Sequence, residues 1–467
     1  MRRIFIALAV MLAACASSAA QGTVRIETRK NTRTPEWTPY ETQTLAGLPG
    51  FKMRRTDPAT DKYGGWTCET YEATGFFHTR KIGDRWWIID PEGHPYIFKG
   101  VACLSIGHSD RQQAALVERF GDMRTWAEHE CGFLRENGFN GLGAWSRVDD
   151  VRECGTPLPY TVIVNPMGRY HGAHLKKFGG KYLFHSWQNY RFDLAMVFDP
   201  EFDKYVESEI SKIARYKDDP WLVGYYTDNE IPWVNDALDR HLTLLAHDEP
   251  AYLTVRKWFD ERKGKNAGPA DITPEDRLAF SAFYLETYLS KVTAALRKYD
   301  PNHMYLGCRF NQWKEELRNK AVFETAGKYM DIISVNHYQR WTPDMEEITN
   351  FGTWSGKPFM VTEFYTKGED SGLPNSTGAG WNVHTQKERG LFYQNFALAL
   401  LRSKCCVGWH WFKYMDNDPE DLKTDPSNRD SNKGLVKWNF ERYDEALAPM
   451  KELNDRCYRI ILWMDKK

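Results

Sequence analysis

The chain has 467 residues, 42% of them hydrophobic and 27% charged. This composition is typical of a compact globular protein. The formal net charge of −1 argues against a nucleic acid or an anionic membrane surface as the partner.

The first residues have the layout of an export signal. A pair of arginines precedes an apolar stretch at 4–14, which predicts a secretory signal over residues 1–21. The run that ends at Cys15 resembles the lipobox of bacterial lipoproteins, while residues 18–20 offer an ordinary cleavage site. We therefore expect an exported protein, periplasmic or held at the cell surface by an N-terminal lipid anchor.

The residue pattern after the signal changes near residue 76. Residues 22–75 are polar and broken by prolines and glycines, which predicts an extended N-terminal strap with little core of its own. Apolar runs at 76–79 and 85–89 then flank a Gly-Asp turn, and a second turn at 90–93 leads into a further run. Such runs predict a β-hairpin. We expect residues 76–467 to form one domain.

From there, short apolar strands alternate with longer helical patterns, such as those at 124–137 and 280–299. The eight candidate strands are 96–102, 139–145, 160–165, 222–230, 304–310, 332–338, 359–364 and 407–412. The alternation predicts an α/β fold, a single (β/α)8 TIM barrel. An open doubly wound sheet alternates in the same way, but no Gly-x-Gly-x-x-Gly turn follows the first strand, and eight strands suit closure better.

Two glutamates stand at the ends of these strands. The fourth strand is an apolar run that ends in Asp228, Asn229 and Glu230, and Glu363 ends an otherwise apolar seventh strand. An ionised buried glutamate costs free energy unless it is paired or used, and barrel enzymes place their chemistry at the carboxyl ends of the strands. Two carboxyl groups about 5–5.5 Å apart can cleave a glycosidic bond with retention, one as acid and one as nucleophile, without a cofactor.

Metal sites are not indicated by the sequence. The nine cysteines lack the paired short spacings of zinc ligands, and free buried thiols explain them more simply than disulfides do. The polar loop 414–433 lacks the glycine and glutamate positions of an EF-hand, which favours a solvated loop beside the site over a calcium site. We expect no metal and no cofactor.

The motifs resemble those of the clan of retaining β-glycosidases built on (β/α)8 barrels, and within it the β-agarase-like enzymes of the family-fifty type. The resemblance rests on Trp-Ile-Ile-Asp-Pro-Glu-Gly-His-Pro at 87–95, Phe-Asn-Gly-Leu-Gly-Ala-Trp at 139–145, Asp-Asn-Glu at 228–230 and Gly-Trp-His-Trp-Phe at 408–412. It implies that Glu230 is the acid/base and Glu363 the nucleophile of a catalytic domain. Agarases of this family typically carry a substantial N-terminal module, for which the strap leaves little room.

The resemblance also implies three supporting roles. Asn229 would hydrogen-bond the sugar 2-hydroxyl, and Tyr338 would donate a hydrogen bond to the nucleophile and keep it ionised. Trp411 would stack under the sugar next to the cleaved bond, with packing in the barrel as the alternative.

Three further residues at strand ends are candidates for binding substrate. Arg309 would hold the charge of the nucleophile or a substrate oxygen, or else form a plain ion pair at the rim. Trp145 is a second aromatic platform or a packing residue. His337 is a substrate contact or a structural histidine.

The net charge and the aromatic content of 14% suit an uncharged β-linked polysaccharide or oligosaccharide. The resemblance implies a β-galactan such as agarose. A β-glucanase, a β-galactosidase of the same clan and a non-catalytic surface glycan-binding barrel stay open as alternatives. A lyase or esterase is disfavoured because no Gly-x-Ser-x-Gly elbow and no metal-ligand cluster stand at the strand ends.

Overall fold

The computed structural model describes residues 22–30, 34–175, 190–311, 318–338, 340–424 and 427–466. The expected signal segment 1–21, with Cys15, lies outside these residues. Within them, none of the helices has both the length and the apolar character that crossing a membrane would demand.

The strands are β1 (Thr23–Arg29), β2 (Thr38–Gln43), β3 (His78–Ile82), β4 (Arg85–Ile89), β5 (Pro95–Tyr96), β6 (Phe98–Val101), β7 (Gly141–Leu142), β8 (Tyr160–Val164), β9 (Leu222–Thr227), β10 (Met304–Tyr305), β11 (Phe310–Asn311), β12 (Ile333–Asn336), β13 (Phe359–Phe364), β14 (Thr366–Gly368), β15 (Trp381–Val383) and β16 (Cys406–Trp411). The helices are α1 (Asp110–Phe120), α2 (Met123–Glu136), α3 (Val148–Arg152), α4 (Pro166–His174), α5 (Phe202–Ile210), α6 (Ala237–Leu244), α7 (Pro250–Lys263), α8 (Pro274–Tyr299), α9 (Lys320–Tyr329), α10 (Met345–Ser355), α11 (Gln386–Arg402), α12 (Asp444–Asn454) and α13 (Cys457–Asp465).

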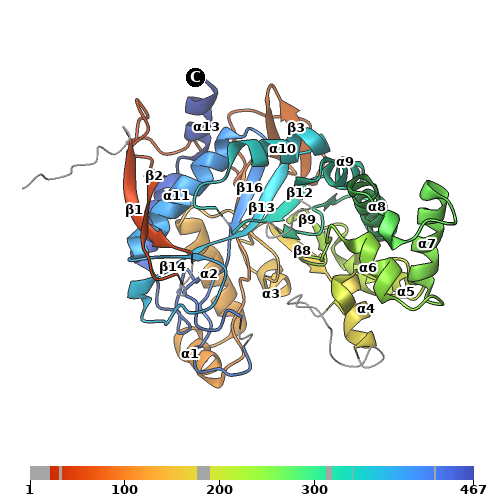
Figure 1. Ribbon diagram of the computed structural model, residues 1–467. Helices are drawn as coiled ribbons and strands as arrows, with labels where there is room; N and C mark the ends of the chain where they lie inside the picture. Colours follow the sequence, from red (N-terminus) through yellow and green to blue (C-terminus); the bar gives the residue numbers. More distant parts are fainter. Residues whose placement is uncertain are drawn as a thin grey trace, which may run out of the picture.

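The central element is a nine-stranded sheet with the order β10-β9-β8-β7-β6-β16-β13-β12-β11. Every neighbouring pair in it is parallel. Each of the eight segments expected to form strands contributes to this sheet, and helices follow most of them along the chain (Figure 1). The α/β class predicted from the sequence is therefore confirmed.

The two ends of the strand order meet in one short segment. β10 and β11 both belong to residues 304–311, which pair with β9 through β10 and with β12 through β11. Between them, the amide of Leu306 donates to the carbonyl oxygen of Tyr225 at 2.8 Å, and the amide of Thr227 donates to Gly307 at 3.1 Å. Residues 304–311 therefore hydrogen-bond to β9 on one side and to β12 on the other.

Alternation along the strands produces two apolar layers. On β13, Met360 packs in a cluster with residues such as Phe98 and Tyr226, on one face of the sheet. Its neighbours Phe359 and Val361 belong to the larger cluster that the sheet shares with the helices. The strands are buried on both faces, as expected for a parallel sheet.

The N-terminal strap contains two β-strands. β1 and β2 pair as an antiparallel hairpin, and β1 pairs with β15, giving a separate sheet in the order β14-β15-β1-β2. This sheet lies at one side of the molecule, beside α11 (Figure 1). The expected hairpin after the strap is also present, because β3, β4 and β5 form a third antiparallel sheet.

Local sequence signals explain where the longest helix begins. Pro274 occupies the first turn of α8, and Thr273 before it forms a capping box with Asp276. The hydroxyl of Thr273 accepts from the amide of Asp276 at 3.3 Å, and the amide of Thr273 donates to the Asp276 carboxylate at 2.9 Å. These bonds satisfy amide groups that would otherwise lack partners at the helix start.

We expect Phe351→Ala to lower the free energy of unfolding by about 3–5 kcal/mol, because truncating a buried phenylalanine leaves a cavity. Phe351 is fully buried in α10, and its ring stacks on that of Phe323 with centroids 5.1 Å apart. The measurement is denaturant unfolding. Leu422→Ala is the control, since Leu422 is 78% exposed, and a similar loss in both variants would contradict this view of the core.

Candidate active site

The carboxyl ends of several strands share an unusual backbone conformation. Five residues other than glycine have φ in the left-handed region there, namely Cys103 (55°), Trp145 (60°), Asp228 (55°), Glu230 (50°) and Arg309 (54°). Each such residue costs about 1–3 kcal/mol and persists only where the surroundings impose it. Clusters of this kind are typical of functional sites.

Glu363 is aimed by an irregularity in its strand. The pairing of β13 with β12 skips Thr362, so that Asn336 stands opposite Glu363. Such a bulge re-aims the side chain that follows it. The carboxylate of Glu363 accepts a hydrogen bond from Nη2 of Arg309 at 2.6 Å and another from the hydroxyl of Tyr338. Glu363 is only 6% exposed, so these two donors stabilise a buried carboxylate.

Glu230 is tied to the same cluster through Asn336. Nδ2 of Asn336 donates to Oε1 of Glu230 at 2.8 Å and to Oδ1 of Asn229 at 3.2 Å. The carbonyl oxygen of the Asn336 side chain accepts from the hydroxyl of Thr362 at 2.7 Å, next to Glu363 in the chain. One asparagine on β12 therefore connects the ends of β9 and β13, and brings Glu230 and Glu363 into one site.

Arg309 contacts two aromatic rings in addition to its ion pair with Glu363. Its guanidinium carbon lies 4.2 Å from the ring centroid of Trp145 and 5.5 Å from that of Tyr226. Trp145 is half-buried and meets the ring of Phe412 edge-on, with centroids 6.4 Å apart. Cation–π contacts of this kind hold a buried guanidinium in place.

Asp228 fixes the backbone that carries Asn229 and Glu230. Its carboxylate accepts from the amides of Met167 and Gly168 at 3.0 and 2.9 Å, at the start of α4, and from the hydroxyl of Tyr288 at 2.8 Å. Burial raises the pKa of Asp228 to about 6, and the two amides and the hydroxyl oppose that rise. Asp228 therefore positions the strand end.

Comparisons with known proteins identify relatives of the whole described fold. The chain is 25% identical to β-agarase B of Vibrio sp. (strain JT0107) over 515 aligned positions, covering 90% of this chain and 52% of that protein. It is 26% identical to β-agarase A of the same strain, covering 73% of this chain and 37% of that protein. The chain therefore spans about half or less of the length of these curated relatives.

Among solved structures, BpGH50 has a TM-score of 0.82 and 29% identity, with 95% of this chain and 96% of that chain covered. The chain is a homologue of β-agarases. An exo-β-agarase with 20% identity has a TM-score of 0.73, over 87% of this chain and 68% of that chain, and shows the shared fold. No protein-family profile matches the sequence.

Two residues expected to contact substrate in this β-agarase homologue do not line the site. Trp411 is fully buried, its indole nitrogen donates to the carbonyl of Lys433 at 2.8 Å, and its ring meets that of Phe364 at 5.5 Å. His337 is 1% exposed, and its ring packs on Phe396 of α11 at 5.3 Å. Both side chains belong to the layer between sheet and helices, because they alternate with inward-facing neighbours on their strands.

The structure also brings residues to the site that sequence reasoning missed. Asn336 and Thr362 lie between the two glutamates, and the half-buried Phe412 follows Trp411 at the end of β16. Strand alternation could have identified Asn336, since a Tyr338 that reaches Glu363 requires Asn336, two residues earlier, to face the same way. The bulge at Thr362 had no signal in the sequence.

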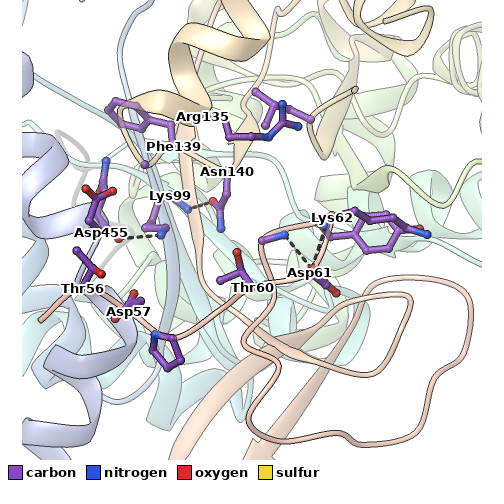
Figure 2. Close-up of a pocket in the computed structure, with 16 residues that line it drawn as sticks. Thr56, Asp57, Thr60, Asp61, Lys62, Lys99, Arg135, Phe139, Asn140 and Asp455 are labelled. Atoms are coloured by element: carbon purple, nitrogen blue, oxygen red, sulfur yellow. Dashed lines mark hydrogen bonds between the residues drawn. The ribbon is translucent and has the colours of Figure 1, made fainter. Parts of the chain in front are cut away.

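The described cysteines are free, and most of them are buried. A pocket of about 390 Å³ lies away from Glu363, among Asp57, Lys99 and Asn140, where β6 and β7 begin (Figure 2). Its rim includes Asp61, which pairs with His94 at 2.8 Å. In barrel enzymes this end of the strands serves stability and not chemistry.

The buried state of His337 predicts an acid-sensitive contribution to stability. Burial lowers the pKa of His337 to about 3, so its favourable contribution is present above the unfolded pKa of about 6.5 and is lost as pH falls below it. When the pH falls from 7.5 to 4.5, the free energy of unfolding should drop by about 2–3 kcal/mol less in His337→Gln than in the wild type. His247→Gln, at an exposed position, is the control, and equal pH slopes in all three proteins would contradict the assignment.

Proposed function

We propose that this β-agarase homologue is a retaining β-glycoside hydrolase on a closed (β/α)8 barrel, and that it acts on a β-galactan such as agarose. Closure is supported by the segment 304–311, which pairs with both β9 and β12. With that segment counted as one strand, the sheet has eight strands, the number for which the barrel is known. A catalytic domain over 76–467 follows from this proposal.

The observation that carries the proposal is the different surroundings of the two glutamates. Glu363 is held by the guanidinium of Arg309 at 2.6 Å and by Tyr338, which suits an ionised nucleophile. Glu230 is half-buried and accepts an amide hydrogen from Asn336. Two carboxyl groups with different partners can start the cycle in opposite protonation states, as a double displacement requires.

In the first step Glu230, protonated, gives its proton to the leaving oxygen while Glu363 attacks the anomeric carbon and forms the glycosyl-enzyme. Glu230 then takes a proton from water, the water attacks the same carbon, and Glu363 is released as a carboxylate. Asn229, anchored to Asn336, would bind the sugar 2-hydroxyl, and Trp145 with Phe412 would form the aromatic wall. No metal or cofactor takes part in this scheme.

The proposed substrate is supported by two relatives that are named β-agarases. A β-glucanase, a β-galactosidase of the same clan and a non-catalytic glycan-binding barrel remain the competing functions. We also propose export to the periplasm or cell surface, as the signal at 1–21 predicts, because a polysaccharide substrate lies outside the cell.

Replacing either glutamate by glutamine should lower the rate of agarose hydrolysis by about 10³-fold or more, since each change removes a proton or charge that the mechanism needs. Reducing ends released from agarose measure this, with β-glucan as the comparison. Glu324→Gln is the matched control, because Glu324 lies on the surface with its side chain 52% exposed. Full activity in both Glu230→Gln and Glu363→Gln would refute the mechanism, and cleavage confined to β-glucan would refute only the substrate.

Chemical rescue distinguishes the two roles. In Glu230→Ala with a substrate whose leaving group needs no acid, azide should replace water and restore turnover as a β-glycosyl azide, because azide attacks the glycosyl-enzyme without a general base. Nuclear magnetic resonance of the product gives the anomeric configuration. An α-configured azide would show inversion, and Glu363 could then not be the nucleophile.

A further inference from the structure

Two lysines lie beside the aromatic wall of the proposed site, on the loop that follows β16. The amide of Lys413 donates to the carbonyl of Lys433 at 3.2 Å, so the two backbones are adjacent. Nζ of Lys433 lies 5.3 Å from the ring centroid of Phe412, which in turn meets the ring of Trp145 beneath Arg309. Lys433 is 1% exposed and Lys413 is half-buried.

Neutral amides, and not carboxylates, hold both ammonium groups. Nζ of Lys413 donates to Oδ1 of Asn417 at 2.6 Å, and Nζ of Lys433 donates to Oδ1 of Asn428 at 2.5 Å. Nδ2 of Asn417 also donates to Oδ1 of Asn428 at 3.0 Å, which joins the two pairs. Across the described ranges, no carboxylate oxygen lies within 4.0 Å, the limit for an ion pair, of either lysine ammonium group.

The acid nearest in the chain is already engaged. Asp416 accepts from the amides of Lys433 and Gly434 at 2.7 and 2.6 Å and from the hydroxyl of Tyr443 at 2.8 Å. Asp416 therefore shapes the loop. It favours the charged forms of both lysines from a distance, without a direct ion pair to either.

Two buried positive charges side by side destabilise each other. Burial lowers the pKa of both lysines, and for Lys433 the neighbouring Lys413 lowers it further. A negative group placed between them would favour the charged forms of both. Lysine binds sulfate-like and carboxylate groups as a point charge without demanding a fixed geometry.

A competing role for the lysines is to hold the charge of Glu363. That carboxylate already has Arg309 at 2.6 Å and the hydroxyl of Tyr338, and the lysines are not within ion-pair distance of it. Lys433 lies against Phe412, and Phe412 contacts Trp145. The lysines therefore stand beside the aromatic wall against which the proposed function places the sugar.

We propose that Lys413 and Lys433 form a subsite for an anionic substituent, a sulfate ester or a carboxylate, on the sugar bound next to Glu363. This inference rests on the proposed function and narrows its substrate class. It departs from the uncharged glycan expected from the net charge, because a net charge of −1 says nothing about the local potential in a cleft.

The test compares three β-galactan oligosaccharides of equal length that are unsubstituted, sulfated or carboxylated at the sugar flanking the cleaved bond. The wild type should show a kcat/KM at least about tenfold higher on an anionic substrate, and 0.5 M salt should reduce this preference by screening. Comparing kcat/KM between the two anionic substrates shows whether the subsite prefers a sulfate ester or a carboxylate. In Lys413→Gln/Lys433→Gln the preference should fall below about threefold.

Lys437→Gln is the matched control, since this lysine pairs with Glu441 on the surface and should leave the preference intact. Absence of a preference in the wild type, or an equal loss on all three substrates in the double variant, would overturn the subsite. If the double variant does not fold, calorimetric binding of galactose 6-sulfate and galactose to the wild type decides, and equal affinities overturn the subsite. Failure of the wild type to cleave any of the three would instead refute the proposed function.

Discussion

The ion pair between Arg309 and Glu363 is the interaction on which the rest of the site depends. Arg309 is fully buried, and its backbone belongs to the segment that pairs with both ends of the sheet. Removing one partner of a buried pair leaves an uncompensated charge, at a cost of about 3–5 kcal/mol. The residue that binds the carboxylate of Glu363 is thus carried by the backbone that joins β9 to β12, so the geometry of the site and the integrity of the sheet are coupled.

Much of this architecture could be predicted from the sequence. The eight apolar segments were recognisable because strands buried on both faces read as continuous hydrophobic runs. Glu230 and Glu363 were conspicuous because a glutamate at the end of such a run needs a partner or a role. Arg309 is predicted from its place at a strand end and Tyr338 from the family resemblance, and the structure puts both on Glu363.

The alternatives that the sequence leaves open concern side-chain direction, which depends on strand register. The resemblance implies a site role for Trp411, and its strand end makes His337 a candidate. Both face the helices, in agreement with the structural alternative stated for each. The pairing of β13 with β16 shifts twice, and each shift exchanges the inward and outward faces. No particular residue type marks a bulge in the sequence. The sequence therefore predicts where the strands end but not which face of the sheet each side chain occupies there.

The N-terminal strap contacts the candidate active site through β15. β1 pairs with β15, and the indole of Trp381 on β15 donates to the carbonyl of Tyr338 at 3.0 Å, the tyrosine that contacts Glu363. A chain trimmed back to residue 76 would leave β15 as an open edge strand with unpaired amides and carbonyls, and such an edge recruits strands from other molecules. Removing the strap would therefore favour aggregation through the edge strand that contacts Tyr338, the partner of Glu363.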